Sequence, residues 1–199
     1  VLASPAQGDI PAFSLGGVST NQPPSFTGSR GFSFGNSYIA ITQLGVFDSG
    51  ADGLVNPHQI GVWRFDGTLL ASATVPAGTA APLVDGYRYV SISPLILDIG
   101  GIVAAQYSAG DADDLVTPGP SANYPPDVFI VNGRYGFGEG LPYPNLVTAT
   151  VGGNPGTRKF YEVNFRYVVP EPSTLLLLGF GGVLLVLIRK AACWRRSSL

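Results

Sequence analysis

Before Pro170 the chain shows no sustained helical repeat of apolar residues, and short apolar runs recur between Gly, Pro, Asp and Asn instead. The 27 Gly and 17 Pro among 199 residues break the chain too often for long helices. Alternation of apolar and polar residues is typical of strands with one buried face. The pattern therefore predicts an all-β fold, an antiparallel β-sandwich over residues 31–169. Candidate strands span 38–47, 59–65, 68–75, 87–93, 102–107, 128–132 and 160–169, with a weaker one at 31–34.

Two of these strands have a well-defined pattern. In the last one, Glu162, Asn164 and Arg166 alternate with apolar residues, which predicts a half-buried strand that ends beside Pro170. Asp66-Gly67 stands between two apolar runs and favours a hairpin with a two-residue type I′ turn. The residues expected in the core are Trp63, Phe65, Leu69, Val75, Val90, Ile92, Val163 and Phe165.

Two segments are expected to be irregular. Residues 1–30 are rich in Pro, Ser, Gly and Thr, and their start fits the end of a secretory signal peptide. Residues 108–127 carry four prolines and an acidic cluster with Asp111, Asp113 and Asp114. That cluster is either an oxygen-rich cation site or a solvated acidic loop.

The last thirty residues have a different character. Pro170, Glu171 and Pro172 form an extended hinge, because proline lacks an N–H and restricts the residue before it. An apolar run follows, expected to form one short transmembrane helix; it is shorter than the usual span of about 20 residues. The residues assigned to this helix include Leu175, Leu176, Leu177, Leu178, Val183, Leu184, Leu185, Val186, Leu187 and Ile188. The basic residues that stop transfer and fix the C-terminus on the cytoplasmic side are Arg189, Lys190, Arg195 and Arg196.

This order of hinge, short span and basic tail over 170–199 resembles the PEP-CTERM sorting signal of Gram-negative bacteria. The resemblance implies that a membrane-embedded exosortase recognises Pro170-Glu171-Pro172 and removes the tail. The protein is then expected in the inner membrane in transit, and afterwards at the cell surface or in the extracellular exopolysaccharide matrix. A plain single-span anchor is the alternative.

Charge and cysteine content limit the class of partner and the source of stability. Residues 1–169 hold seven Lys and Arg against twelve Asp and Glu, a net charge of −5, while residues 170–199 have a net charge of +3. An acidic domain without a basic stripe argues against nucleic acid as a partner. Cys193, the single cysteine, lies in the tail, so the preceding domain is expected to be stable without a disulfide.

A second resemblance covers residues 31–107, in LGVFDSGADGLVNPHQIGVWRFDGTLLASATVP, GYRYVSISP and AAQY. These segments resemble a β-sandwich family of unassigned function that is common in exported bacterial proteins. The resemblance implies a jelly-roll-like sandwich and supplies no catalytic residues.

The loop around Asp48 is a candidate calcium site. Asp48 and Asp52 have the spacing of positions one and five of an EF-hand loop, Gly53 supplies the turn, and Leu54 offers a carbonyl oxygen. Gln59 occupies the position where that motif requires a bidentate Glu. Two carboxylates can hold calcium weakly; the alternative is a turn in which the aspartates cap their own backbone.

Catalytic residues are scarce in this sequence. His58 is the single histidine and is expected to be a partly exposed residue at a strand entry. Paired carboxylates such as Asp113 and Glu139 are the basis of the alternative function, a secreted carbohydrate-active enzyme. Tyr124, Tyr135 and Tyr143 lie in Gly/Pro-rich segments, where exposed rings can stack on sugars, or else cap the ends of the sandwich. The sequence thus predicts a non-enzymatic exported module without a required cofactor, in contact with sugar or calcium.

Overall fold

The computed structural model describes residues 9–16, 25–111, 121–148 and 160–170. These residues form antiparallel strands and one 3-10 helix, η1. The strands are β1 (Ile10–Pro11), β2 (Ser14–Gly16), β3 (Gly28–Asn36), β4 (Ile39–Phe47), β5 (His58–Trp63), β6 (Leu69–Val75), β7 (Leu83–Val84), β8 (Tyr87–Leu97), β9 (Gly101–Tyr107), β10 (Ser121–Asn123), β11 (Val128–Phe137), β12 (Leu146–Val147) and β13 (Val163–Val168), with η1 at Ser49–Ala51.

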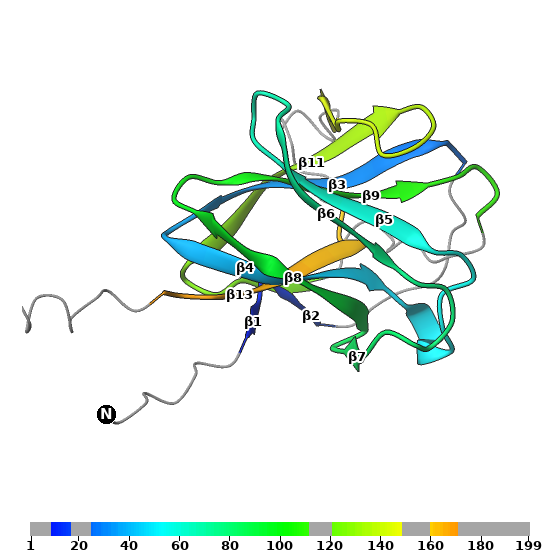
Figure 1. The fold of residues 1–199 in the computed structure, drawn as a ribbon, viewed down its shortest axis with the longest axis horizontal. Coiled ribbons are helices and arrows are strands. Elements are labelled where there is room, and N and C mark those ends of the chain that lie inside the picture. Colours follow the sequence, from blue (N-terminus) through cyan, green and yellow to red (C-terminus); the bar gives the residue numbers. More distant parts are fainter. Residues whose placement is uncertain (1–8, 17–24, 112–120, 149–159, 171–199) are drawn as a thin grey trace, which may run out of the picture. The chain divides into compact units, whose positions relative to one another are not determined.

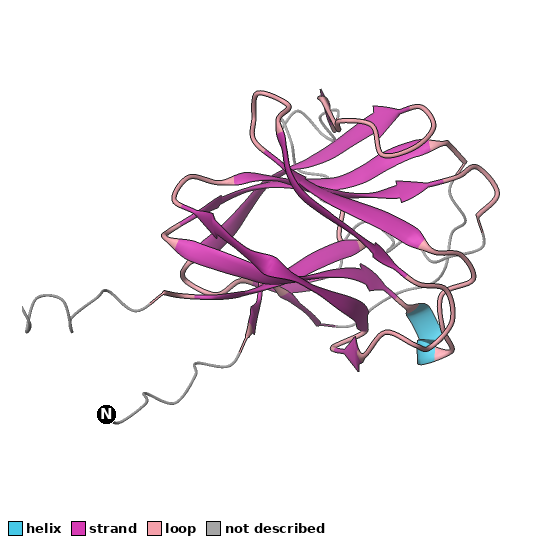
Figure 2. Cartoon of the chain, in the orientation of Figure 1, coloured by secondary structure: helices cyan, strands magenta, loops and turns pink. Residues whose placement is uncertain are grey.

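Two sheets lie face to face in Figures 1 and 2. The five-stranded sheet has the order β1-β13-β4-β8-β7, and the six-stranded sheet has the order β12-β11-β3-β9-β5-β6. A further short pair joins β10 to β2. The predicted antiparallel β-sandwich is confirmed, and each of the eight predicted strands overlaps an observed one. The jelly-roll-like description stays a prediction.

Aromatic rings from both sheets fill the core. Phe165 of β13 lies 4.8 Å from Phe34 and 6.3 Å from Phe32 of β3, measured between ring centroids. Phe13 contacts Phe32 at 5.7 Å. Of the residues expected in the core, Val75, Val163 and Phe165 are fully buried, while Val90 and Ile92 are partly buried against it.

The prediction for the N-terminal residues was wrong in part. Residues 1–30 were expected to be irregular, but β1 pairs with β13 at Ile10↔Tyr167, and Phe13 is fully buried in the core. The strand β3 also begins at Gly28 rather than at residue 31. The sandwich therefore recruits a segment rich in Pro and Ser, because pairing and burial outweigh its weak local strand preference.

The hairpin around Gly67 is confirmed, but its turn differs from the predicted type I′. Gly67 N–H donates to the Arg64 carbonyl, and Gly67 has φ +93°, whereas Asp66 is not among the residues with positive φ. A type I′ turn needs positive φ at both central residues, so this is a three-residue hairpin with a glycine bulge. Phe65 sits in this turn and is 52% exposed, which corrects its expected core position.

A shift in strand pairing explains a second error. Val62 pairs with Ala71, but Trp63 pairs with Leu69, so the register of β5 and β6 shifts by one residue. A one-residue shift exchanges the two faces of a strand. Leu69 is consequently exposed, and Leu70 packs partly buried against the core in its place.

Trp63 is buried as predicted, but not in the core cluster. A Cβ built on Gly61 would lie 2.5 Å from the Trp63 ring, so the indole covers Gly61 on the same side of β5. Ile60 and Val62, which alternate with these residues, face the core. The Tyr143 ring lies 6.4 Å from the indole and helps to cover it.

The last strand is more buried than its sequence pattern predicts. Glu162 and Asn164 were expected on an exposed face, yet both are buried. The Asn164 side-chain amide donates to the Phe13 carbonyl at 3.0 Å, and the Glu162 carboxylate lies 2.7 Å from the Arg30 guanidinium. The half-buried interpretation was therefore wrong, because the N-terminal segment and the partly buried Arg30 cover that side.

The chain divides into one compact unit over Val1–Val169 and a second over Pro170–Leu199. In the first unit, β13 ends at Val168, two residues before Pro170. The predicted transmembrane residues and the basic stop lie outside the described residues. Within the described part of the chain, none of the helical segments has the length and apolar character needed to span a bilayer.

Alkaline pH should unfold this domain through its buried tyrosines. Burial raises the pKa of Tyr87, Tyr89, Tyr161 and Tyr167 above the ordinary value of 10.0. Their contribution to stability is full below the unfolded pKa, and it is lost as pH rises above about 10 toward the raised folded values. We expect tyrosinate absorbance to appear together with loss of near-ultraviolet circular dichroism. Gradual ionisation with an unchanged dichroism spectrum would contradict this.

Candidate functional site

The sorting hinge follows the sandwich without a linker. Residues of β13 pair with β4 from Val163↔Val46 to Val168↔Ala40, and Pro170 is the last described residue. Because proline has no N–H to donate, it cannot extend the ladder of β13. Glu171, Pro172 and the tail lie outside the described residues, so the structure places only the start of the predicted motif.

The carboxylate of Asp48 is held inside the protein. Arg88 Nε donates to Asp48 Oδ2 at 2.6 Å, and the side chains are only 5% and 2% exposed, respectively. The Gly53 N–H also lies 3.2 Å and 3.3 Å from the two carboxylate oxygens. Asp48 is thus the partner of a buried arginine, a role that sequence reasoning missed. The sequence did contain an indication of this role: Arg88 is the only charged residue in the predicted strand segment YRYVSI, and a buried arginine needs a partner.

The other two predicted calcium ligands lie in surroundings different from those of Asp48. Asp52 is exposed, and the Leu54 carbonyl accepts the Gly78 N–H at 2.6 Å. In the described part of the chain, no three His, Cys, Asp or Glu side chains gather as a metal site. The geometry favours the alternative, an Asp/Gly-rich turn held by its own hydrogen bonds.

His58 is fully buried, so the expectation of a partly exposed residue was wrong. Its Nδ1 lies 2.8 Å from the Gln106 carbonyl oxygen, and its ring packs 4.8 Å from the Tyr107 ring. Asp111 lies 4.0 Å from Nε2 and accepts the Asn56 amide at 2.6 Å. This cluster ties the β9–β10 loop to the start of β5. Asp113 and Asp114 lie outside the described residues and Glu139 is exposed, so the paired carboxylates of the enzyme alternative stay a prediction.

Each of the three tyrosines predicted to contact sugar makes contacts inside the protein. The Tyr124 hydroxyl lies 2.6 Å from that of Tyr161, and Tyr143 donates to the Phe65 carbonyl at 2.8 Å. The Tyr135 ring is half-buried, 6.5 Å from Phe160. Each makes internal contacts of the kind expected for rings that cap the sandwich.

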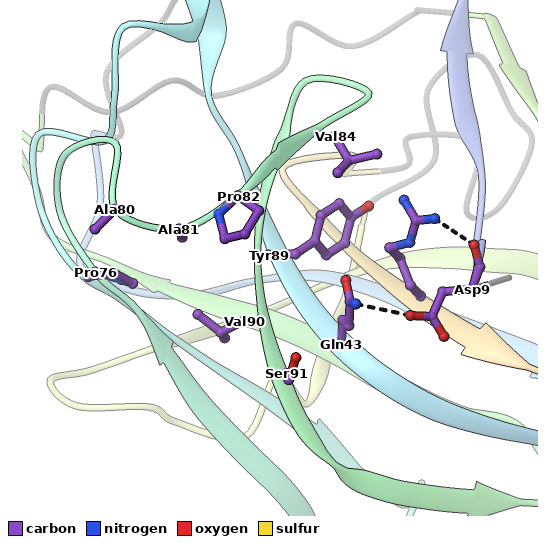
Figure 3. A pocket seen from close by; sticks show the side chains of 11 residues that line it. Asp9, Gln43, Pro76, Ala80, Ala81, Pro82, Val84, Tyr89, Val90 and Ser91 are labelled. Carbon is purple, nitrogen blue, oxygen red and sulfur yellow. Dashed lines mark hydrogen bonds between the residues drawn. The ribbon is translucent and has the colours of Figure 1, made fainter.

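The structure also has a pocket that lies at none of the predicted sites. A pocket of about 530 Å³ adjoins the five-stranded sheet, lined by Gln43 of β4, Tyr89 of β8, Arg166 of β13, Asp9 and the segment between β6 and β8 (Figure 3). Gln43 and Arg166 are paired across the strands, on the opposite side from the buried Leu44. Its volume falls in the range of small-molecule sites, about 300–1,000 Å³. Sequence reasoning missed this pocket, because its residues come from four separate segments.

Comparison with known proteins identifies the tail. The family model described as the PEP-CTERM protein-sorting motif matches residues 168–196. No curated protein and no solved structure matches the chain. The match and the fold define an exported β-sandwich protein with a C-terminal sorting signal. The chain carries the PEP-CTERM signal and is in that sense an exosortase substrate, as the sequence predicted.

Replacing Asp48 should destabilise the domain strongly. Asp48→Asn leaves the Arg88 charge buried without its carboxylate, and loss of one partner of a buried pair costs about 3–5 kcal/mol. The matched control, Asp52→Asn, removes an exposed carboxylate in the same loop and should stay within about 0.5 kcal/mol. Chemical denaturation measures both. Equal effects of the two variants would show that the buried pair has no special role.

Calcium should leave the melting temperature unchanged, because Asp48 and Leu54 already bind protein donors. The comparison is thermal unfolding in excess calcium against excess chelator, with magnesium as the control cation. A site with millimolar affinity would instead add about 1.4 kcal/mol at a tenfold excess of calcium. A calcium-specific rise that Asp52→Asn abolishes would restore the calcium hypothesis.

Proposed function

We propose that this protein is a non-enzymatic module of the cell surface or extracellular matrix, which exosortase releases from the inner membrane of a Gram-negative cell and which associates with exopolysaccharide. The main support for this proposal is the sorting motif at residues 168–196, which begins at the end of β13. Cleavage within this hinge would leave the strands of the sandwich intact, because β13 ends at Val168 and the compact unit ends at Val169.

The proposal that the module is non-enzymatic is supported by three buried carboxylates that bind other side chains of the protein. Asp48 binds Arg88, Glu162 binds Arg30, and Asp111 binds Asn56. General acid or base catalysis needs a group that can reach the substrate, whereas these carboxylates are buried against protein partners. A structural or binding role fits such a distribution better than hydrolysis.

Replacing Glu171 with Ala should retain the protein in the inner membrane, because it removes the charged residue of the Pro-Glu-Pro hinge. Cells producing Glu171→Ala are fractionated, and the protein in each fraction is measured by intact mass, which also reports loss of the tail. The matched control is Glu139→Ala, an exposed glutamate far from the motif in sequence. Release of Glu171→Ala to the same extent as the unmodified protein would refute sorting through this hinge.

A further inference from the structure

The pocket beside the five-stranded sheet has an aromatic wall created by a glycine. A Cβ built on Gly45 would lie 2.6 Å from the Tyr89 ring, so the ring lies across Gly45 where no other side chain fits. Figure 3 shows this ring between Pro82 on one side and Asp9 on the other. Val84 and the proline add apolar surface to this wall. Pro82 and Val84 thus offer apolar surface to the C–H groups of a sugar ring, while the Tyr89 ring behind them is buried.

The Tyr89 hydroxyl has no hydrogen-bond partner among the described residues. The side chain is only 3% exposed, and its hydroxyl oxygen is buried. Burial also raises the pKa of this tyrosine, so the group stays a protonated donor. A buried hydroxyl without a partner is unfavourable, and native structures rarely keep one without a reason. A hydroxylated ligand in the pocket would supply the missing partner.

Polar groups at the other side of the pocket are already positioned. Asp9 accepts the Gln43 amide at 3.0 Å through its carboxylate, and its carbonyl accepts Arg166 Nη2 at 2.6 Å. Thr42 donates to the second carboxylate oxygen at 2.9 Å. This network holds the Arg166 guanidinium 5.7 Å from the Tyr89 ring centroid. Arginine has five N–H donors. Among the described residues, the Arg166 guanidinium donates to one acceptor, the Asp9 carbonyl, so further donors remain for a ligand.

The charge of the pocket favours an uncharged ligand. One cation, Arg166, and one anion, Asp9, line it together. The sandwich segment as a whole, residues 1–169, has a net charge of −5, which repels polyanions at long range. Donors from Arg166 and Tyr89, with acceptor lone pairs on Asp9 and Ser91, suit a ligand that both donates and accepts hydrogen bonds. Vicinal hydroxyl groups do both.

We infer that this pocket binds one uncharged sugar unit of an extracellular polysaccharide, with Tyr89 and Arg166 as its principal donors. The inference deepens the proposed function and rests on it for the choice of polysaccharide. It also assigns sugar contact to residues other than Tyr124, Tyr135 and Tyr143.

The test is affinity electrophoresis of the full chain in mild detergent, with polysaccharide cast into the gel. Three probes are used: exopolysaccharide from the producing cells, dextran as an uncharged chain, and alginate as a uronate chain. Tyr89→Phe removes only the hydroxyl and should weaken binding about two- to tenfold, the range for one neutral hydrogen bond. Arg166→Gln should weaken it about tenfold or more, since its donors are charged. Tyr38→Phe and Arg64→Gln, both exposed and outside the pocket, are the matched controls.

Thermal unfolding of Tyr89→Phe separates binding from folding. Removing an unpartnered buried hydroxyl should leave the melting temperature unchanged or raise it, while binding weakens. A lowered melting temperature would mean that the hydroxyl has a structural partner, and would overturn the inference. Binding to an uncharged sugar should also persist at high salt, whereas ionic adsorption is screened.

The outcomes distinguish the two proposals. Retardation by the cells' own exopolysaccharide that is unchanged in Tyr89→Phe and Arg166→Gln overturns the pocket and leaves the proposed function standing. Retardation by alginate alone, lost at high salt, overturns the uncharged ligand. Absence of retardation by all three probes overturns both the pocket and the exopolysaccharide association, while sorting is judged separately by the fate of Glu171→Ala.

Discussion

The buried guanidinium of Arg88 is the contact on which one side of the sandwich depends. Besides the Asp48 carboxylate, it donates to the carbonyls of Thr79 and Ala81 at 3.2 Å and 2.9 Å, and to that of Ala51 at 3.3 Å. A single side chain on β8 thus fixes both the β4–β5 loop and the β6–β7 loop. The next residue, Tyr89, turns to the other side of the strand and forms the pocket wall. Loss of the ion pair would therefore also disturb the pocket, because Arg88 holds the Ala81 carbonyl, and Ala81 and Pro82 line the pocket.

The remainder of the fold relies on burial, because Cys193 in the tail is the single cysteine of the chain. Rings of β3 and β13 meet between the sheets, and β13 has neighbours on both sides, β1 and β4. The sorting signal is thus attached to an inner strand of the sheet. A cut at the hinge would leave Phe165 and Tyr167 in the core, so release and folding do not conflict. Pro170 has no N–H with which to extend the ladder of β13.

The sequence predicted local features well and tertiary ones poorly. Alternation located the long strands, since a period of two depends only on neighbouring residues. It failed at Leu69, where a register shift exchanged the faces, and at residues 9–16, where β1 forms by pairing with β13 and β2 by pairing with β10. It also failed at Glu162, which is buried because Arg30 comes from a strand about 130 residues away. Periodicity contains no information on what covers the second face of a strand.

The same limit explains why the predicted aromatic contacts and the pocket differ. Tyr124 and Tyr143 looked available because Gly and Pro surround them, yet each hydroxyl has a protein partner. Tyr89 lies in the predicted strand 87–93 without a pattern that singles it out, and its ring is buried. What sets it apart is the hydroxyl, which lacks a partner among the described residues and adjoins a pocket that also contains Arg166. A binding residue is recognised here by an unmet hydrogen bond, since exposure alone does not separate a ligand platform from a capping ring.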